Sequence, residues 1–478
     1  MSTRKALVFS FADRHSGLVI HMATAIVIAR LLTPGDIGVY SIAMVLVTFV
    51  SNFRDLGAGQ YLVQKRQITQ DDLRAVWAVQ LYVGLILASV VAVASFPAAA
   101  IYREPRMIGI LWVVALNFAI TPVMGYQYAW LVREMRFGAL ASIRFSSAIA
   151  TSIVAIGLAW KEVGPISLAW GNLAGTIAGI AVFALLDYSK LPWRPKISRV
   201  KEVITFGGMM TLLTLIRSIN YGMAEMFLGR LQGMHDTGLY SRARGIVSVF
   251  DDIVTAAVNT VAMPYFAKEL RLGRDVKGPF LHASALVTVL GWSFYGSLAV
   301  LAYPTIRLLY GDQWDDAVDP ARWLAIGSLF LVTSSVCLGP LLALGALTPL
   351  VRVSLVVFGV EAVMAGFGAY LGLLMLTKIL IIVCAIQMTL WLRLGHRFVG
   401  FEWSDLFRTY RGSAIVAIAT TSIPLVTMLY FGWRSPSIVL SLSIAVPGGL
   451  AAFLAASWAV KHPIWSEIVN ALRAIRER

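Results

Sequence analysis

The sequence predicts an all-α polytopic membrane protein of about 14 transmembrane helices, with two six-helix repeat lobes around a central cavity plus two extra C-terminal helices. Of its 478 residues, 58% are hydrophobic and only 14% are charged. The mean hydropathy is +0.77, and this composition is typical of proteins whose solvent is mostly lipid. Two further observations support this fold class: a series of long apolar stretches, and a motif that occurs twice in the chain.

The apolar stretches are long enough to cross a membrane. Crossing about 30 Å of hydrocarbon takes about 20 mainly apolar residues, and short polar breaks separate fourteen such stretches. The expected spans run near residues 9–31, 37–53, 75–96, 107–129, 139–160, 165–187, 202–227, 241–266, 280–303, 320–345, 351–374, 376–393, 412–431 and 436–458. Residues 461–478 alternate apolar and polar positions, which predicts a short helix on the membrane surface.

The repeated motif divides the chain into two related halves. Arg30-Leu31, Asp36, Gly38 and Tyr40-Ser41 recur as Arg230-Leu231, Asp236, Gly238 and Tyr240-Ser241, each time between two apolar segments. We therefore expect an N-lobe over 1–190 (spans one to six) and a C-lobe over 201–400 (spans seven to twelve), joined by a cytoplasmic linker at 191–200. Spans thirteen and fourteen (401–460) and the cytoplasmic tail (461–478) have no counterpart in the other half.

The distribution of lysine and arginine predicts the orientation in the membrane. With fourteen spans, both termini lie on one side, and the loops on that side contain 26 of these cations, against 8 in the opposite loops. The positive-inside rule then places both termini in the cytoplasm. The formal net charge of +15 is mainly this topology signal. Nucleic-acid binding is excluded because the cations are scattered over many loops and form no continuous basic face.

Polar residues recur on one face of four helices, before and after each copy of the motif. Residues three, four and seven apart share a helix face, and the polar faces contain Arg14 in span one, Arg217 in span seven and Arg244 in span eight. An arginine inside the bilayer is costly, so it faces protein or water and indicates function. Arg242 is a weaker candidate, because two residues from Arg244 it points to the other side of the helix. Arg144 and Glu361 are lone intramembrane charges without a predicted role.

Several other classes of site are not supported. The two cysteines, Cys337 and Cys384, lie singly inside apolar spans, so we expect buried thiols rather than a disulfide or a metal site. The six histidines show no metal-ligand spacing, and no Walker-type glycine loop is present. We therefore expect a protein that is not an enzyme and has no cofactor.

The chain resembles the polysaccharide (Wzx-type) transporters, a family of the multidrug/oligosaccharidyl-lipid/polysaccharide flippase superfamily. The resemblance covers essentially the whole chain, and four segments in the right order make it fairly specific. These segments are Arg30–Asp55 with Tyr61–Arg66, Arg133–Ile143, Gly229–Ala243, and Leu308–Gly311 followed by Trp314 and Ala317. The resemblance implies that a lipid-linked oligosaccharide, carried on undecaprenyl diphosphate, crosses the bacterial inner membrane toward the periplasm. It also implies a monomeric transporter that works beside a chain-length regulator and a polymerase.

The same resemblance implies roles for individual residues. Relatives in the superfamily have arginines near the pyrophosphate, which by position correspond to Arg14, Arg54, Arg217 and Arg244. Guanidinium groups bind phosphate oxygens in bidentate fashion. Candidates for coupling or charge balance are Asp55, Glu225, Asp251 and Asp252. The family often has an acid five places before the glycine at Gly229. Ala224 stands there instead, with Glu225 next to it, which puts the coupling role of that acid in doubt.

Two other functions are compatible with parts of the sequence. A cation-coupled multidrug antiporter of the same superfamily shares the two-lobed plan, but it favours carboxylates over arginines in its cavity. A membrane polysaccharide polymerase or glycosyltransferase needs acids or a long periplasmic loop, and the longest such loop, around Asp312–Asp319, is short. The residues leave open whether membrane potential, a proton or a sodium ion drives transport, and which sugar is carried.

Overall fold

The computed structural model is helical throughout the part of the chain that it describes. It describes residues 17, 19–53, 69–187, 195, 218–434 and 437–476. Within these residues, twelve helices are long and apolar enough to cross a membrane. The first and seventh of the fourteen expected spans overlap undescribed segments, and their described parts are the helices Val19–Leu31 and 218–231. By contact the chain forms two compact units, Met1–Gly238 and Leu239–Arg478. The expected linker at 191–200 lies outside the described residues, apart from Pro195.

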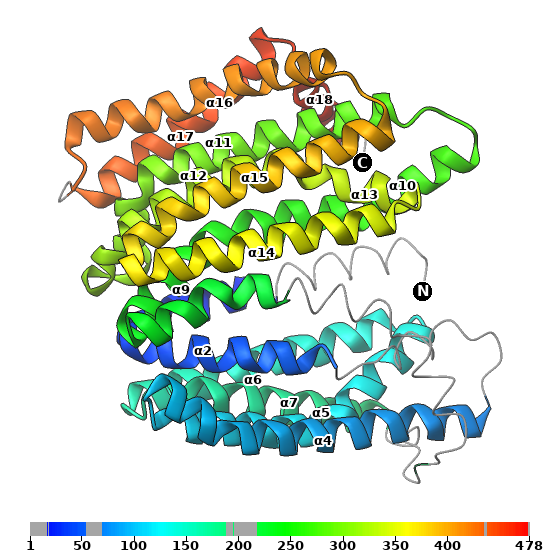
Figure 1. The fold of residues 1–478 in the computed structure, drawn as a ribbon, viewed down its shortest axis with the longest axis vertical. Helices are drawn as coiled ribbons and strands as arrows, with labels where there is room; N and C mark the ends of the chain where they lie inside the picture. The colour runs from blue at the N-terminus through cyan, green and yellow to red at the C-terminus, as the bar shows by residue number, and fades with distance from the viewer. Residues whose placement is uncertain are drawn as a thin grey trace. The chain divides into compact units, whose positions relative to one another are not determined.

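The first unit is a bundle of antiparallel helices, and short connections join its last four long helices (Figure 1). Thr33 and Asp36 form a capping box at the start of α2, and Thr69 and Asp72 form one at the start of α4. Such boxes pair backbone N–H groups that the first turn of a helix leaves free. The long helices of this unit are α2 (Pro34–Ser51), α4 (Gln70–Tyr102), α5 (Arg106–Arg133), α6 (Phe137–Trp160) and α7 (Ile166–Asp187).

Small residues bring α6 and α7 into close contact. Gly171, Gly175 and Gly179 recur at every fourth position of α7, and a Cβ atom on Gly175 would lie 2.8 Å from the backbone oxygen of Ser147 on α6. A Cβ atom on Gly171 would lie 2.8 Å from the backbone oxygen of Thr151. Packing of this kind is common between membrane helices, because small residues let two backbones approach.

The two copies of the repeated motif pack against each other through their glycines. A Cβ atom on Gly38 would lie 1.8 Å from the backbone oxygen of Met234, and one on Gly238 would lie 1.8 Å from the backbone oxygen of Pro34. The contact is reciprocal: each glycine meets the first residue of the helix that contains the other. The repeat therefore has a structural role at this point, because no side chain fits where the two helix starts meet.

The second unit contains the remaining long helices and three irregular turns. A π-helix (Asp251–Thr255) interrupts the expected span 241–266, and a 3₁₀ turn (Ser335–Cys337) interrupts the expected span 320–345. Its elements are α9 (Met234–Phe250, which begins in the first unit), η2 (Asp251–Thr255), α10 (Ala256–Arg271), α11 (Lys277–Tyr310), η3 (Asp312–Ala317), α12 (Val318–Ser334), η4 (Ser335–Cys337), α13 (Leu338–Ala343), α14 (Leu347–Leu371), α15 (Leu373–Val399), α16 (Trp403–Phe431), α17 (Ile438–Ala459) and α18 (Pro463–Arg476).

The last three helices form one group on α11. α16 and α17 lie side by side, and both pack against α11 (Figure 1). Three residues separate α18 from α17, and Ile464 of α18 is buried in a cluster with Val289, Val416 and Phe453. Leu472, further along α18, is exposed. The expected helix in the C-terminal tail is therefore confirmed, and its first turn is anchored in the bundle.

Candidate functional site

The described residues include half of the predicted site. Arg244, Asp251 and Asp252 lie in the second unit, and Glu225 lies in the first. The other predicted site residues lie outside the described residues: Arg14, Arg54, Asp55 and Arg217.

Arg244 is the central residue of a charged cluster inside the second unit. It lies on α9, half-buried, and its guanidinium is an electrostatic neighbour of Asp251 and of Glu361 on α14. Glu361 is in turn an electrostatic neighbour of Cys384 on α15. Three membrane helices far apart in the sequence thus contribute to one cluster. The sequence pattern predicted no role for Glu361. A usable signal was nevertheless present, because Glu361 is the single acid in the 25 residues of α14, and Arg352 is the only other charged residue there.

The π-helix sets the position of the two aspartates. Thr255 Oγ1 donates to Asp251 Oδ1 at 2.9 Å, and Ser248 Oγ donates to Asp252 Oδ2 at 3.4 Å. A π turn adds one residue to a helix and is frequent at functional sites. Both aspartate side chains are exposed although they lie within a long apolar helix. An ionised carboxylate inside a bilayer needs water or a charged partner, and the Arg244 guanidinium is such a partner for Asp251.

A buried tyrosine completes the cluster. Tyr295 on α11 is only 1% exposed, and its hydroxyl has no direct hydrogen-bond partner among the described residues. Asp251 and Ser328 are its polar neighbours. A buried hydroxyl without a partner is costly. The hydroxyl is therefore placed to donate a hydrogen bond to the neighbouring Asp251 carboxylate.

Arg242 lies on the other side of α9, as expected. Its guanidinium stands over the rings of Tyr310 and Trp314, at 5.8 and 5.9 Å from their centroids. Trp314 is fully buried. Arg242 therefore stabilises the connection between α11 and α12 through cation–π contacts, whereas Arg244 faces the acids.

Glu225 is a buried acid of the first unit. It lies on the helix 218–231, is 5% exposed and is part of the first unit. The structure thus brings Arg244, Asp251 and Asp252 together, and adds Glu361 and Tyr295 to them. The three carboxylates of this cluster can take up protons or a cation. Once they are neutralised, the guanidinium can bind an anion.

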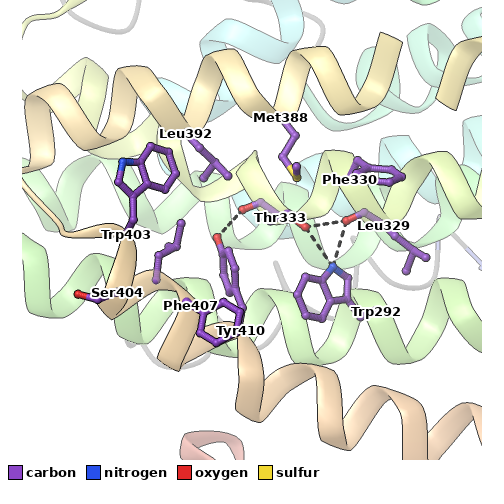
Figure 2. A pocket seen from close by; sticks show the side chains of 11 residues that line it. Trp292, Leu329, Phe330, Thr333, Met388, Leu392, Trp403, Ser404, Phe407 and Tyr410 are labelled. Carbon is purple, nitrogen blue, oxygen red and sulfur yellow. Dashed lines mark hydrogen bonds between the residues drawn. The ribbon is translucent and has the colours of Figure 1, made fainter. Parts of the chain in front are cut away.

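The second unit also has an apolar pocket of about 740 Å³ beside the first turns of α16. Figure 2 shows Trp292, Thr333 and Tyr410 in its wall, tied together by hydrogen bonds. Tyr410 Oη donates to the Thr333 backbone oxygen at 2.9 Å, and Trp292 Nε1 donates to the Leu329 backbone oxygen at 3.0 Å. A second apolar pocket shares Trp292 and Leu329 and continues along α16 to Leu425. Together the two form a groove along α16.

Comparison with known proteins gives consistent matches. Residues 27–319 match the family model described as "Polysaccharide biosynthesis protein". The chain is 22% identical to the succinoglycan biosynthesis transport protein ExoT of Rhizobium meliloti, over 96% of this chain and 93% of ExoT. It is 20% identical to the lipopolysaccharide biosynthesis protein WzxC of Escherichia coli, over 63% of this chain and 62% of WzxC.

Solved structures show the same fold. The lipid II flippase MurJ in its inward closed conformation matches with a TM-score of 0.77 at 13% identity, over 98% of this chain and all of MurJ. An inward-facing multidrug resistance transporter of the MATE family matches with a TM-score of 0.62 at 15% identity, over 84% of this chain and 99% of the transporter. The family match covers more than half of the sequence, and the resemblance seen in the sequence is confirmed. The chain is a multi-pass membrane protein that belongs to the polysaccharide biosynthesis protein family, and it has the fold of MurJ and of the MATE transporter.

Proposed function

We propose that this protein flips undecaprenyl-diphosphate-linked oligosaccharide repeat units across the bacterial inner membrane by alternating access. The product serves the synthesis of lipopolysaccharide or an exopolysaccharide. The observation that carries the proposal is the nearly full-length relation to ExoT, whose name describes transport in succinoglycan biosynthesis. The match to a lipid II flippase supports it, because the fold of that protein accommodates a lipid-linked cargo.

In this proposal arginines bind the diphosphate. Arg244 provides one of them, and its cluster on α9, α14 and α15 supports the assignment. Arg14, Arg54 and Arg217 are proposed to act with it. A guanidinium fits phosphate oxygens with two parallel hydrogen bonds and keeps its charge over the physiological pH range.

The acids around Arg244 are proposed to couple transport to an ion. Asp251, Asp252 and Glu361 together carry up to three negative charges beside one positive charge, so the cluster repels a diphosphate while all three are ionised. Uptake of protons or a cation by these acids removes the repulsion, because like charges a few ångströms apart interact strongly away from bulk water. Binding of the diphosphate and uptake of the ion are then linked.

We assign the lipid tail of the substrate to the apolar groove along α16. The groove runs from Trp403 to Leu425, which is about 33 Å of helix at about 1.5 Å per residue. That length matches the thickness of the hydrocarbon core. Its walls expose almost no polar surface apart from groups that are already hydrogen-bonded, so an isoprenoid chain loses no hydrogen bond on entering.

Reconstitution tests the proposal. The purified full-length protein is placed in liposomes that contain lipid-linked oligosaccharides of several compositions, and transfer between leaflets is measured. We expect transfer of at least one diphosphate-linked oligosaccharide, and none in liposomes without protein. Absence of transfer for every diphosphate-linked oligosaccharide, in protein shown to be folded by thermal unfolding, contradicts the proposal.

A second candidate function is cation-coupled multidrug antiport. Two observations favour it: the likeness to a MATE transporter and the excess of carboxylates around Arg244. The same liposomes distinguish the two functions. Movement of small organic cations against a proton or sodium gradient, without transfer of lipid-linked oligosaccharide, supports the antiporter.

A further inference from the structure

A basic pocket of about 370 Å³ lies in the second unit, where α11, α16 and the junction of α17 with α18 meet. It shares no residue with the Arg244 cluster or with the apolar groove. Three residues give it its positive character: Arg408 and Arg411 on α16, and Lys461 between α17 and α18. His282 on α11 also lines it.

Three cations of this pocket form no ion pair with any described acid. Among the described residues, Arg408, Arg411 and Lys461 form no ion pair, and no carboxylate lines the pocket. Two acids lie beside the pocket, and Asp405 is an electrostatic neighbour of Arg408. Asp405 Oδ2 accepts from Lys277 Nζ at 2.7 Å, and Glu467 Oε1 lies 3.5 Å from His282 Nε2. The pocket therefore offers about three positive charges to an anion.

The wall of the pocket is built around a buried neutral histidine. His462 is 4% exposed, and its Nδ1 accepts a hydrogen bond from the backbone N–H of Ile464 at 3.2 Å. The proton is therefore on Nε2, which donates to Ser413 Oγ at 3.2 Å. Burial, reinforced by the nearby His282, lowers the pKa of His462 to about 4. This residue fixes the start of α18 against α16 and leaves the charge of the pocket to the exposed cations.

The pocket also has apolar side chains in its lining. Leu281, Ile415 and Val460 line it. Because α16 begins at Trp403, α11 begins at Lys277 and α17 ends at Ala459, the pocket lies close to the ends of three membrane helices. A site that combines cations with apolar side chains near the helix ends fits a ligand with an anionic head and an acyl chain. Basic pockets of this kind between membrane helices recognise lipid headgroups.

We propose that this pocket binds the phosphodiester headgroup of an anionic phospholipid, such as phosphatidylglycerol or cardiolipin. Arg408, Arg411 and Lys461 contact the phosphate, and the acyl chain follows Ile415. The bound lipid joins α18 to the α16–α17 pair at the membrane surface. Free inorganic phosphate shares the headgroup chemistry, but it makes no use of the apolar part of the pocket. The proposal does not depend on the transported substrate.

Binding of short-chain lipids to the purified full-length protein tests the site. The probes are dioctanoyl phosphatidylglycerol, dioctanoyl phosphatidylcholine and inorganic phosphate, and the dissociation constant of each is measured in a neutral detergent. We expect saturable binding of phosphatidylglycerol at least about tenfold tighter than that of the other two probes. Equal binding of phosphatidylcholine shows that the charge is not recognised. Equal binding of phosphate shows a soluble-anion site. Either result overturns the proposal.

Variants locate the binding. Each interfacial Lys or Arg contributes about 1 kcal/mol, or about fivefold, so Arg408→Gln with Arg411→Gln is expected to weaken binding roughly thirtyfold. Lys461 has a positive φ of 52°, where glycine is favoured. Lys461→Gly is therefore expected to weaken binding about fivefold without loss of thermal stability. The matched control, Arg393→Gln with Arg397→Gln on α15, keeps the affinity within about twofold. Unchanged affinity in both pocket variants, or equal loss in the control, overturns the assignment.

Discussion

Two arginines on α9 show how a difference of two positions decides the role of a residue. Arg244 faces the acids of α9–α10 and α14, whereas Arg242 stacks on the rings of Tyr310 and Trp314. Helical periodicity was sufficient to separate them. It was not sufficient to find Glu361, because the contact joins residues more than a hundred positions apart and depends on how α14 packs. The roles of Arg14, Arg54, Arg217 and Asp55 remain predictions.

The buried His462 gives the junction of α17 and α18 a defined pH dependence. Its pKa is lowered from 6.5 to about 4, so between these values the unfolded chain binds a proton that the folded chain does not. Stability therefore falls as the pH decreases from about 6.5 to 4, by on the order of 3 kcal/mol. Thermal unfolding of the purified protein between pH 7.5 and 4.5 measures this effect.

Substitution of His462 isolates its contribution to the pH dependence of stability. His462→Gln is expected to flatten the fall in melting temperature between pH 6.5 and 4.5, since it removes the titrating group. The control is His235→Gln, at an exposed site whose side chain has 61% accessibility, and it is expected to keep the wild-type profile. A His462→Gln profile parallel to that of the wild type contradicts the assignment.

At the scale of elements, the reciprocal contact of Gly38 and Gly238 makes a sharp prediction. Gly238→Ala places a methyl group about where the Pro34 backbone oxygen lies, and a backbone cannot move aside as a flexible side chain does. We expect destabilisation of about 1–3 kcal/mol, seen as a lower melting temperature. Gly245→Ala on the same helix has open space around it and is expected to be neutral or stabilising. Equal melting temperatures for the two variants contradict the packing described here.

The groove along α16 makes a second prediction at this scale. Ile418 lines it and is 70% exposed, so Ile418→Trp fills the groove without disturbing the core. We expect the KM for a lipid-linked substrate to rise roughly tenfold. This corresponds to the binding free energy lost when about two methylene groups are no longer buried. Val426→Trp is the control, since Val426 is exposed on the same helix but does not line the groove. Similar transport kinetics for both variants place the lipid tail elsewhere.

The lengths of the apolar stretches predicted the positions of the helices well, but they did not predict local irregularities within them. The expected span 75–96 corresponds to α4, which extends beyond it at both ends, and the expected span 412–431 corresponds to α16, which begins nine residues earlier. The π turn at Asp251–Thr255 and the 3₁₀ turn at Ser335–Cys337 were not predicted. Each is a shift in backbone hydrogen bonding over a few residues, and it leaves the apolar character of the segment unchanged. The reciprocal glycine contact was not predicted either, although the repeat marked both residues.

At the scale of the whole molecule, the topology predicted by the positive-inside rule can be tested by labelling. In a variant without Cys337 and Cys384, a single cysteine is introduced by Asp312→Cys or Ser466→Cys, both at exposed positions. We expect a membrane-impermeant maleimide to label the first in intact cells and the second only after permeabilisation, since the tail is predicted to be cytoplasmic. The opposite labelling pattern shows that the topology is the reverse of the predicted one.

The fold class and the family were both accessible from the sequence, because composition, span length and the repeat act over the whole chain. The sequence predicts fourteen spans, and the described residues contain twelve helices that are long and apolar enough to cross a membrane. The charged cluster, the groove and the basic pocket depend on contacts between distant helices. The basic pocket in particular joins residues from α11, α16 and the chain after α17, a combination that no local pattern reveals.

The most direct test of the central claim compares transport by Arg244 and Arg242 variants in liposomes with a diphosphate-linked oligosaccharide. Arg244→Gln is expected to slow transfer roughly ten- to a hundredfold, the loss of a charge-assisted hydrogen-bonded pair. Arg242→Gln is expected to keep the rate within about threefold when corrected for folded protein, because the lost cation–π contacts contribute to stability. Wild-type transfer by Arg244→Gln, or equal losses in the two variants, contradicts binding of the diphosphate by Arg244.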